Sequence, residues 1–336
     1  MTRYLGNKTK LCDWLYSQIA EISPGNPPPK KFYDLFSGTG AVSERFKGCY
    51  NIVSCDNLVS SYMTTNLKLL NRIPEFTELG GVDSVLSTLN ALDGYDGEIY
   101  KLYSESGPGH RLYFSSDNGR KIDAVRTLLF KWRSEGTINE DENTYLWGCF
   151  IYAIHTVANT TGVFGAHLKK LSNKKILNLK RYDLIKTANV HIARHMDNIA
   201  LLAEIEPNDI VYLDPPYNSR QYGSNYHLLE SICIDAPIII KQVRGGESKS
   251  GLPVSLPVSD MCSKRKVVAS LKQYISCRAK KIYLSYNSEG LLTEDAIMEI
   301  MSPYGNVDLV KKEHGQYCSN KNNHIIYEYL FCLSKD

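Results

Sequence analysis

The sequence predicts a doubly wound α/β protein whose sheet domain is interrupted by a mostly helical segment. Three observations carry this prediction. The first is an opening unit in which the apolar run KFYDLF leads through the glycine turn SGTG into the helical pattern AVSERFK. The second is the return of apolar runs with NDIVYLD, far along the chain. The third is that the stretch between them carries helical rather than strand patterns.

Length and composition describe an ordinary globular protein. The chain has 336 residues, 43% of them hydrophobic and 22% charged, which suffices for one large domain or for one domain with a sizeable insertion. These proportions exclude the disordered and fibrous classes. The formal net charge of +3 at pH 7 permits binding to nucleic acid but does not demonstrate it.

Cysteine usage and the N-terminal sequence indicate a reduced, cytoplasmic protein. The nine cysteines include no CxxC pair and no alternation with histidine, so we expect neither a zinc site nor a redox motif, and no metal. The basic start MTRYLGNKTK lacks the apolar stretch of a secretory signal. Since no apolar run approaches the roughly 18 residues that a membrane span needs, we expect no membrane partner.

A first helix is predicted over residues 9–22, where apolar side chains recur at near-helical spacing before SPGNPPP stops them. In the unit that follows, the helical pattern places Val42 and Phe46 inward, and NIVSCD forms a strand that ends on Asp56. A strand, a glycine turn, a helix and a second strand with a terminal acid are together typical of a sheet that binds a nucleoside.

Residues 71–186 differ from the rest in being rich in Gly, Ser, Asn and Tyr, with helical patterns over 121–133 and 144–158. We predict that they form an inserted domain, and that residues 1–70 and 187–336 form the sheet domain. The remaining strands are predicted at NDIVYLD, KKIYLSYN, NVDLVKK and IIYEYLFCL. The Gly/Ser/Pro-rich stretch 245–259 is expected to be a mobile loop.

The most specific motif is Asp214-Pro215-Pro216-Tyr217, which directly follows an apolar strand. In an open parallel sheet, ligands bind beyond the carboxyl ends of the strands, so this tetrad lies where chemistry is expected. The Asp214 carboxylate and the Pro215 carbonyl are two acceptors suited to the two hydrogens of an amine on an aromatic ring. Tyr217 offers a ring on which a base rotated out of a duplex can stack. The alternative is a plain strand-ending turn, which Asp and Pro also favour.

Gly38 and Gly40 occupy a tight strand-to-helix turn, where the backbone can come close to a cofactor. A dinucleotide site would carry the full pattern GxGxxG facing a pyrophosphate, and that pattern is incomplete here. A cofactor without phosphates therefore fits better. Asp56 is placed to accept hydrogen bonds from both hydroxyls of a ribose, although an acid that caps a helix is the alternative.

In combination, these motifs resemble the adenine-specific DNA methyltransferases of the Dam-like class with DPPY sites, and most closely their FokI-type modification enzymes. The resemblance rests on RYLGNKTKL, YDLFSGTGAVSERF, CDN, DIVYLDPPYNSRQY and YLSYNSEGLL, in the order of the family's alpha group. It implies an S-adenosylmethionine-dependent, Rossmann-like sheet domain with an inserted, mostly helical target-recognition domain. It also implies methyl transfer from S-adenosylmethionine to the exocyclic amino group of adenine in double-stranded DNA by base flipping.

The resemblance carries specific residues with it. By position, the family pattern implies cofactor contacts at Tyr4, Lys8, Asp56 and Asp214, and a cofactor pocket lined by Phe36, Gly38 and Gly40. In the N-terminal RYLGNK, we expect Gly6 to allow close approach of the cofactor, and a basic surface segment is the alternative. Lys8 has a second expected role, which is to order the catalytic loop. Asp197 matches an acid that approaches the cofactor's adenine in relatives, and its alternative is a solvated helix-start acid. DNA contacts are implied at Asn218, Arg220, Tyr222, Lys169 and Lys170, and an aromatic wall of the base pocket at Tyr317. For Lys169 and Lys170, a loop with solvated lysines is the alternative.

Other functions stay open at this point. An RNA amino-methyltransferase with the same tetrad and a non-catalytic DNA-binding module are the two main alternatives. Methylation of the cytosine amino group is a third, although those enzymes usually carry serine in place of Asp214. The resemblance further implies a restriction-modification system with a partner endonuclease, and we expect a monomer.

Overall fold

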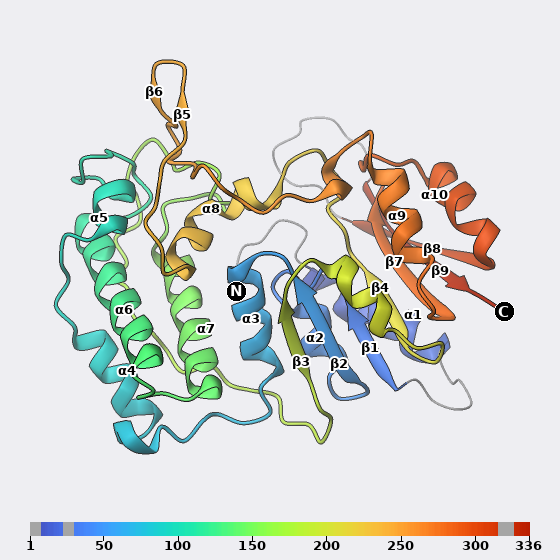
Figure 1. Cartoon of the computed structure of the whole chain (residues 1–336), viewed down its shortest axis with the longest axis horizontal. Helices are drawn as coiled ribbons and strands as arrows, with labels where there is room; N and C mark the ends of the chain where they lie inside the picture. Colours follow the sequence, from blue (N-terminus) through green and yellow to red (C-terminus); the bar gives the residue numbers. More distant parts are fainter. Residues whose placement is uncertain (1–7, 23–29, 315–325) are drawn as a thin grey trace. The chain divides into compact units, whose positions relative to one another are not determined.

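The computed structural model of the chain describes residues 8–22, 30–314 and 326–336. Within those ranges the chain forms two compact units (Figure 1). Residues 58–187 and 223–257 make up one, called the helical unit below, and residues 8–57, 188–222 and 258–336 make up the other, called the sheet unit.

The sheet unit is built on a seven-stranded sheet with the strand order β3-β2-β1-β4-β7-β9-β8. The first five strands in that order are parallel, and β9 runs antiparallel to both β7 and β8. The strands are β1 (Lys31–Asp34), β2 (Asn51–Asp56), β3 (Ile192–His195), β4 (Ile210–Leu213), β7 (Lys281–Asn287), β8 (Asn306–His314) and β9 (Ile326–Ser334).

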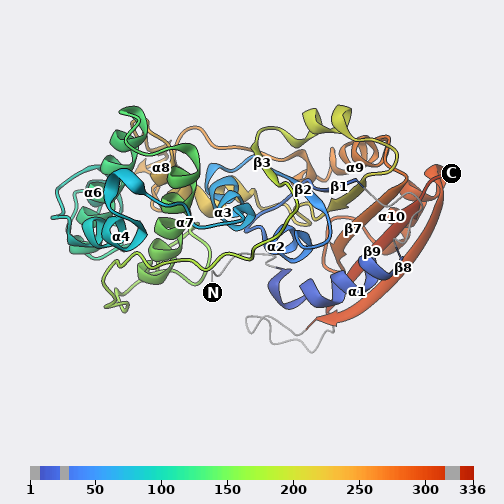
Figure 2. The same cartoon turned by 90° about the horizontal axis from the view of Figure 1, so that it is seen from below.

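Helices cover both faces of this sheet. Alternate side chains along each strand point to opposite faces, so each face packs against its own set of helices. On one face Phe32 of β1 stacks on Phe46, the last residue of α2 (Ala41–Phe46), at 4.6 Å between ring centroids. The same face meets α1 (Cys12–Ile22), and Figure 2 shows both helices on this side. The other face packs against α9 (Val267–Ile275), α10 (Glu294–Met301) and the 3-10 helix η3 (Asn198–Glu204).

The helical unit contains six helices, of which the last begins one residue before it. They are α3 (Val59–Leu69), α4 (Val82–Ala91), α5 (Glu98–Tyr103), α6 (Ser116–Ser134), α7 (Glu140–Val157) and α8 (Tyr222–Cys233). A hairpin of β5 (Gln242–Val243) and β6 (Gly246–Glu247) completes the unit. The helical unit also has the short 3-10 helix η2 (Thr77–Leu79), and the sheet unit has η1 (Lys8–Lys10), η4 (Asp260–Cys262) and η5 (Ser302–Tyr304).

Close packing and buried polar caps hold the helices of this unit together. Gly148 of α7 faces Leu67 of α3 so closely that an added Cβ would lie 2.4 Å from the leucine Cδ2. The buried carboxylate of Glu230 in α8 accepts hydrogen bonds from the first two backbone N–H groups of α3, those of Val59 and Ser60, each at 2.9 Å. An acid at a helix N-terminus satisfies donors that would otherwise lack partners. The α3–α7 and α3–α8 contacts therefore join segments that are far apart in sequence.

The predicted fold class and most predicted elements are confirmed. The helical pattern over 121–133 lies within α6, that over 144–158 matches α7 except for its last residue, and every strand predicted from an apolar run is present. The expectation for residues 245–259 was wrong in part, because β6 and a hydrogen-bonded turn lie within this stretch. Among the described residues, no helix is long and apolar enough to cross a membrane.

Candidate active site

The candidate site lies where the order of the parallel strands reverses, between β1 and β4. From β1 the chain moves outward through β2 to β3, and then returns to place β4 on the other side of β1. The two strands are in register, with Asp34 opposite Tyr212. Ligands of open α/β sheets bind beyond the carboxyl ends of the strands at such a reversal. The glycine turn after β1 and the tetrad after β4 therefore leave the sheet side by side.

The glycine turn is held by Asp56 at the end of β2. The backbone N–H of Gly38 donates to Oδ2 of Asp56 at 2.8 Å, and that of Gly40 donates to the Ser37 carbonyl at 2.7 Å. Gly38 and Gly40 have φ angles of 51° and 69°, in the left-handed region that other residues rarely adopt. The turn thus places the backbone of half-buried Gly38, with no side chain, beside the half-buried carboxylate of Asp56.

Phe36 and the start of η3 complete this side of the site. The Phe36 ring meets Tyr274 of α9 edge-on at 5.1 Å between centroids. Asn198 donates to the Leu35 carbonyl at 2.6 Å and accepts from the Tyr274 hydroxyl at 2.5 Å, so it fixes the chain just before Phe36. The neighbouring Asp197 is exposed and accepts from the Ile199 N–H at 3.1 Å as the cap of η3. Asp197 could be predicted from the sequence, whereas Asn198 was not predicted.

The tetrad continues directly from the buried strand β4. Pro215 and Pro216 are buried, whereas Asp214 and Tyr217 are partly exposed, with 16% of the Asp214 side chain accessible. The Tyr217 ring packs edge-on against Tyr286 of β7 at 6.5 Å, and its carbonyl accepts from the Leu291 N–H at 2.7 Å. The buried prolines therefore anchor the turn while the carboxylate and the ring keep exposed surface.

A buried lysine joins Asp214 to an acid from the far end of the chain. Nζ of Lys8 lies 3.0 Å from Oδ1 of Asp214 and 2.6 Å from Oε1 of Glu328, and the lysine side chain is 5% exposed. The hydroxyl of Ser285 in β7 donates to the same Glu328 oxygen at 2.6 Å. Sequence reasoning missed Glu328, which lies on β9, since nothing in the local motif indicates an acid so distant in the chain.

The three charges set the protonation of the site. Burial raises the pKa of Asp214, the positive charge of Lys8 lowers it and the negative charge of Glu328 raises it, and the result is a pKa of about 6. Burial by itself lowers the pKa of Lys8, but the two carboxylates outweigh it and hold that pKa well above its ordinary value. At neutral pH Lys8 is therefore a cation, and Asp214 is an anion close to its titration point.

A second buried acid, also missed by sequence reasoning, ends β1. Asp34 accepts a hydrogen bond from the Ser43 hydroxyl at 2.6 Å, while its Oδ1 has no partner among the described residues. Burial, together with the nearby negative charges of Asp214 and Asp56, raises the pKa of Asp34 to about 7, and the Ser43 hydrogen bond opposes this rise. Three carboxylates thus gather at the carboxyl ends of β1, β2 and β4.

The run after the tetrad is a structured turn. Asn218 accepts the Arg220 N–H on its side-chain oxygen at 2.9 Å, and the Arg220 carbonyl accepts from the Cys262 thiol at 3.4 Å. Gln221 exchanges two hydrogen bonds with the backbone of Ser259, at 2.8 and 3.0 Å. The Arg220 side chain is exposed, and Tyr222 opens α8. The backbone of this run is held in place while the Arg220 side chain remains accessible.

Lys169 and Lys170 lie in the helical unit, on an exposed loop after α7. The buried side chain of Asn159 organises this loop, donating to the carbonyls of Leu168 and Lys170 at 3.3 and 3.1 Å. The lysines are therefore presented by a loop of fixed shape. Three other predicted positions, Tyr4, Gly6 and Tyr317, lie outside the described residues.

Comparison with known proteins gives a consistent result. Residues 4–300 match the family described as D12 class N6 adenine-specific DNA methyltransferase. The chain is 34% identical to the type II methyltransferase M.NlaIII of Neisseria lactamica, over 99% of both chains. It is 35% identical to M.FokI of Planomicrobium okeanokoites over 99% of this chain and 53% of that protein. It is 30% identical to M.CviAII of Paramecium bursaria Chlorella virus 1, over 98% of this chain and 97% of the relative.

Proposed function

The chain belongs to the D12 class N6 adenine-specific DNA methyltransferases, and on that premise we propose how its residues carry out the reaction. The enzyme transfers a methyl group from S-adenosylmethionine to the exocyclic amino group of adenine in DNA, as the resemblance of its motifs implied. The observation that carries the assignment of roles is the position of Asp214, at the end of β4 and beside the glycine turn that ends β1.

The residues at the ends of β1 and β2 fit S-adenosylmethionine. Gly38 and Gly40, with their left-handed φ angles, let the backbone approach a ligand without a side chain between them. The carboxylate of Asp56 suits the hydroxyls of a ribose, and Phe36 offers a partly buried aromatic wall. We assign the adenine end of the cofactor to the neighbourhood of Asp197. When bound, the cofactor supplies an electrophilic methyl group on a positively charged sulfur.

The tetrad acts on the target amine. We propose that the two hydrogens of the amine are donated to the Asp214 carboxylate and to the main-chain carbonyl of Pro215. These two hydrogen bonds draw the nitrogen toward the tetrahedral geometry of a nucleophile. Pro216 adds no competing donor, and Tyr217 stacks on the flipped base. Since Lys8 contacts Oδ1 of Asp214 at 3.0 Å, the second oxygen, Oδ2, is assigned to the amine.

Asp214 also serves as the acceptor of the proton that the amine loses. Methylation makes the nitrogen acidic, so one of its hydrogens must leave as the new bond forms. With a pKa of about 6, Asp214 is ionised at neutral pH and close enough to its titration point to take up that proton and release it to water. The positive charge of Lys8 keeps the carboxylate ionised when an uncharged base lies against it.

Recognition of DNA is assigned mainly to the inserted segment. We propose that residues 71–186 form the target-recognition domain and that residues 1–70 and 187–336 form the catalytic domain. Exposed Lys169 and Lys170 suit phosphate contacts, and exposed Arg220 with Asn218 and Tyr222 suits contacts beside the flipped base. Such contacts must offset the free energy of rotating the base out of the duplex, which is roughly a few kcal/mol.

We further propose that the enzyme acts as a monomer beside a restriction endonuclease that cuts the same sequence. The support is that several relatives are named type II methyltransferases and one is named the modification methylase StsI, from Streptococcus sanguinis. A methyltransferase that protects host DNA needs to methylate only one adenine each time it binds, and a single chain with one tetrad suffices for this.

Transfer of labelled methyl groups tests this proposal. Purified enzyme is incubated with labelled S-adenosylmethionine and either unmethylated duplex DNA or structured RNA, and the products are digested to nucleosides. We expect label in N6-methyladenine from DNA. Label in methylcytosine would show that the target base is cytosine, and label in RNA would show that the substrate is RNA. Cofactor binding without any transfer would favour a non-catalytic DNA-binding module.

A further inference from the structure

A short hairpin stands out from the helical unit and has no role in the chemistry described above. β5 pairs with β6 so that Gln242 lies opposite Glu247 and Val243 opposite Gly246, which leaves Arg244 and Gly245 as a two-residue tip. Gly245 has a φ angle of 95°, which favours glycine at this position. All residues from 241 to 247 are exposed, and the hairpin projects beyond the helices of its unit (Figure 1).

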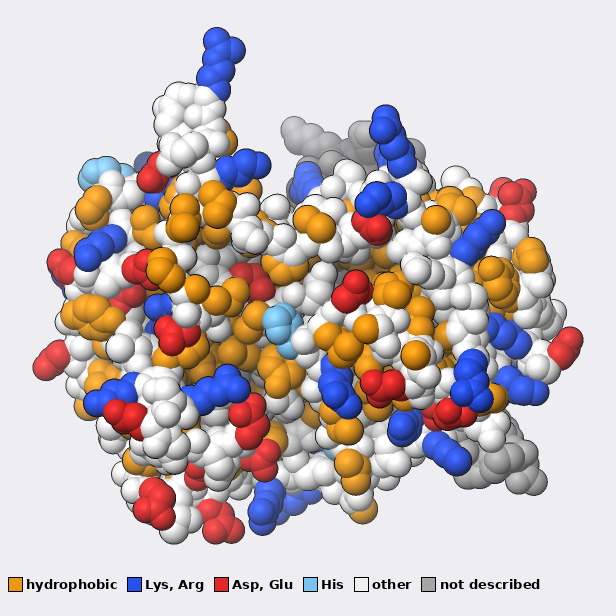
Figure 3. All heavy atoms as spheres, viewed as in Figure 1, with side chains coloured by type: hydrophobic (Ala, Val, Ile, Leu, Met, Phe, Trp, Pro, Cys, Tyr) orange, Lys and Arg blue, Asp and Glu red, His pale blue; other side chains and the backbone are white. Residues whose placement is uncertain are grey.

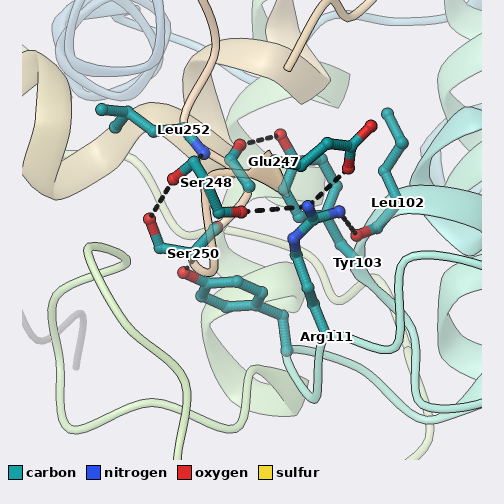
Figure 4. A network of polar contacts seen from close by, with 9 residues as sticks. Leu102, Tyr103, Arg111, Glu247, Ser248, Ser250 and Leu252 are labelled. Carbon is teal, nitrogen blue, oxygen red and sulfur yellow. Dashed lines mark hydrogen bonds and ion pairs between the residues drawn. The ribbon is translucent and has the colours of Figure 1, made fainter. Parts of the chain in front are cut away.

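The base of the hairpin, unlike its tip, is fixed by a buried arginine. Arg111, 4% exposed, donates from Nη2 to Oε2 of Glu247 at 2.8 Å and to the Ser248 carbonyl at 3.0 Å (Figure 4). Its Nη1 donates to the Leu102 carbonyl at the end of α5, at 3.0 Å. These bonds tie the returning strand to the helices, so the direction in which the hairpin points is set by the core of the unit.

Two buried tyrosines hold the turn that follows. The hydroxyl of Tyr103 donates to the Gly251 carbonyl at 2.8 Å, and that of Tyr113 donates to the Ser250 carbonyl at 3.1 Å. Gly251 fits only as glycine, since its φ is 71° and an added Cβ would lie 2.5 Å from the Tyr103 ring. Buried polar groups that fix an exposed ribbon in this way indicate a preorganised binding element rather than a loose loop.

The charge of the hairpin identifies the kind of partner. Between residues 239 and 254 the basic side chains are Lys241, Arg244 and Lys249, all exposed, and the one acid is Glu247. Because Glu247 is paired with Arg111, the basic charges of the ribbon are not offset within it. Figure 3 shows a basic side chain at the outermost end of the projecting hairpin. A positively charged ribbon suits a polyanion far better than a protein surface of mixed charge.

We propose that this hairpin enters a groove of the DNA and that Arg244 reads a base there, which makes it a determinant of the recognition sequence. A two-stranded ribbon fits the major groove, and the arginine fork pairs with the O6 and N7 atoms of guanine in a way that lysine cannot reproduce. Lys241 and Lys249, nearer the foot of the ribbon, contact the flanking phosphates. The inference rests on the proposed function, because it takes duplex DNA as the substrate.

The test uses a library of duplexes with randomised sequence. The library is methylated by the wild type, Arg244→Ala, Arg244→Lys or Arg133→Ala, and the modified adenines are mapped by sequencing. Arg133 is the control, an arginine in the last turn of α6 with a 52% exposed side chain. We expect one or two positions of the wild-type motif to become degenerate in both Arg244 variants and to stay fixed in the control. Discrimination at those positions should fall roughly 5- to 150-fold.

The other outcomes are distinguishable. If the motif is unchanged and Arg244→Ala weakens binding equally for target and non-target duplexes, Arg244 contacts phosphate and the base-reading proposal is overturned. If neither binding nor motif changes in Arg244→Ala, the hairpin does not contact DNA and the proposal is overturned as a whole. If the wild type itself leaves DNA unmethylated, the failure belongs to the proposed function and shows itself before any hairpin variant is tested.

Discussion

At the residue scale, the contacts of Lys8 with Asp214 and Glu328 set the pH range in which the site works. The pKa of Asp214 is about 6, so the acidic limb of the kcat profile is expected near that pH. Lys8→Met removes a positive charge and should move this limb to higher pH. Glu328→Gln removes a negative charge and should move it to lower pH. Shifts in the same direction, or an unmoved limb at lower kcat, would mean that Asp214 is not the titrating group.

The buried Asp34 predicts a pH dependence of stability. Its pKa is raised from 3.8 to about 7, so between these values the folded chain binds more protons there than the unfolded chain. The contribution of this group to the free energy of unfolding therefore falls as pH rises through that window. Asp34→Asn keeps an acceptor for Ser43 and should stabilise the protein by roughly 2–4 kcal/mol above pH 7.

Urea unfolding of Asp34→Asn and wild type at pH 5 and pH 8 checks this sign. The gain should be clear at pH 8 and much smaller at pH 5, where Asp34 of the folded wild type is already protonated. An equal difference at both values would show that the effect comes from packing and that the carboxylate does not titrate in this window.

At the element scale, the α3–α7 contact depends on the absence of a side chain at Gly148. A Cβ there would meet Leu67 at 2.4 Å, so Gly148→Ala should destabilise the protein by about 1–3 kcal/mol in spite of alanine's better helix propensity. Gly48→Ala is the matched control, since nothing lies within 4 Å of its Cβ position. Thermal unfolding compares the two. An unchanged unfolding temperature in Gly148→Ala would mean that the two helices can move apart with little loss of stability.

The same contact offers a second check. Combining Gly148→Ala with Leu67→Ala should lower the free energy of unfolding by less than the sum of the two single changes. The alanine at position 67 leaves room for the methyl group added at position 148. Strict additivity would indicate that the two residues do not press on one another.

Elements that are buried on both sides could be predicted from the sequence, and exposed or very short ones could not. β4 and β7 are central parallel strands and read as unbroken apolar runs. β3 lies at the edge, and none of its four residues, Ile192–His195, is buried, so no apolar run marks it. β5 and β6 have two residues each, too few for any periodicity.

The same physics separates what was predicted of the site from what was missed. The tetrad and the glycine turn are local motifs, so their residues could be named from the sequence. Glu328 reaches Lys8 only because β9 folds back beside β7, and no local pattern records a contact across 320 positions. Asn198 and Asp34 act through buried hydrogen bonds, which depend on the packing around them.

At the scale of the whole molecule, a formal net charge of only +3 means that DNA binding must come from local clusters of basic residues. Lys169 and Lys170 are assigned to two phosphate contacts. Each such contact adds about 0.9 to the slope of log affinity against log salt, so replacing both by alanine should lower that slope by roughly 1.8 without changing the sequence preference. Lys131→Ala, 62% exposed on α6, is the control.

A slope unchanged in the double variant would remove these lysines from the DNA interface. A changed sequence preference would instead mean that at least one of them contacts a base. Titrations with fluorescent duplexes between low and moderate salt distinguish the three results.

The central claim is that Asp214 holds the target amine and takes up its proton. The most direct test is single-turnover methyl transfer by Asp214→Asn, measured beside the affinities for S-adenosylmethionine and duplex DNA. We predict a rate at least about 100-fold lower than that of the wild type, with both affinities within a few-fold. A rate close to that of the wild type, or a loss explained entirely by weaker cofactor binding, would contradict the account.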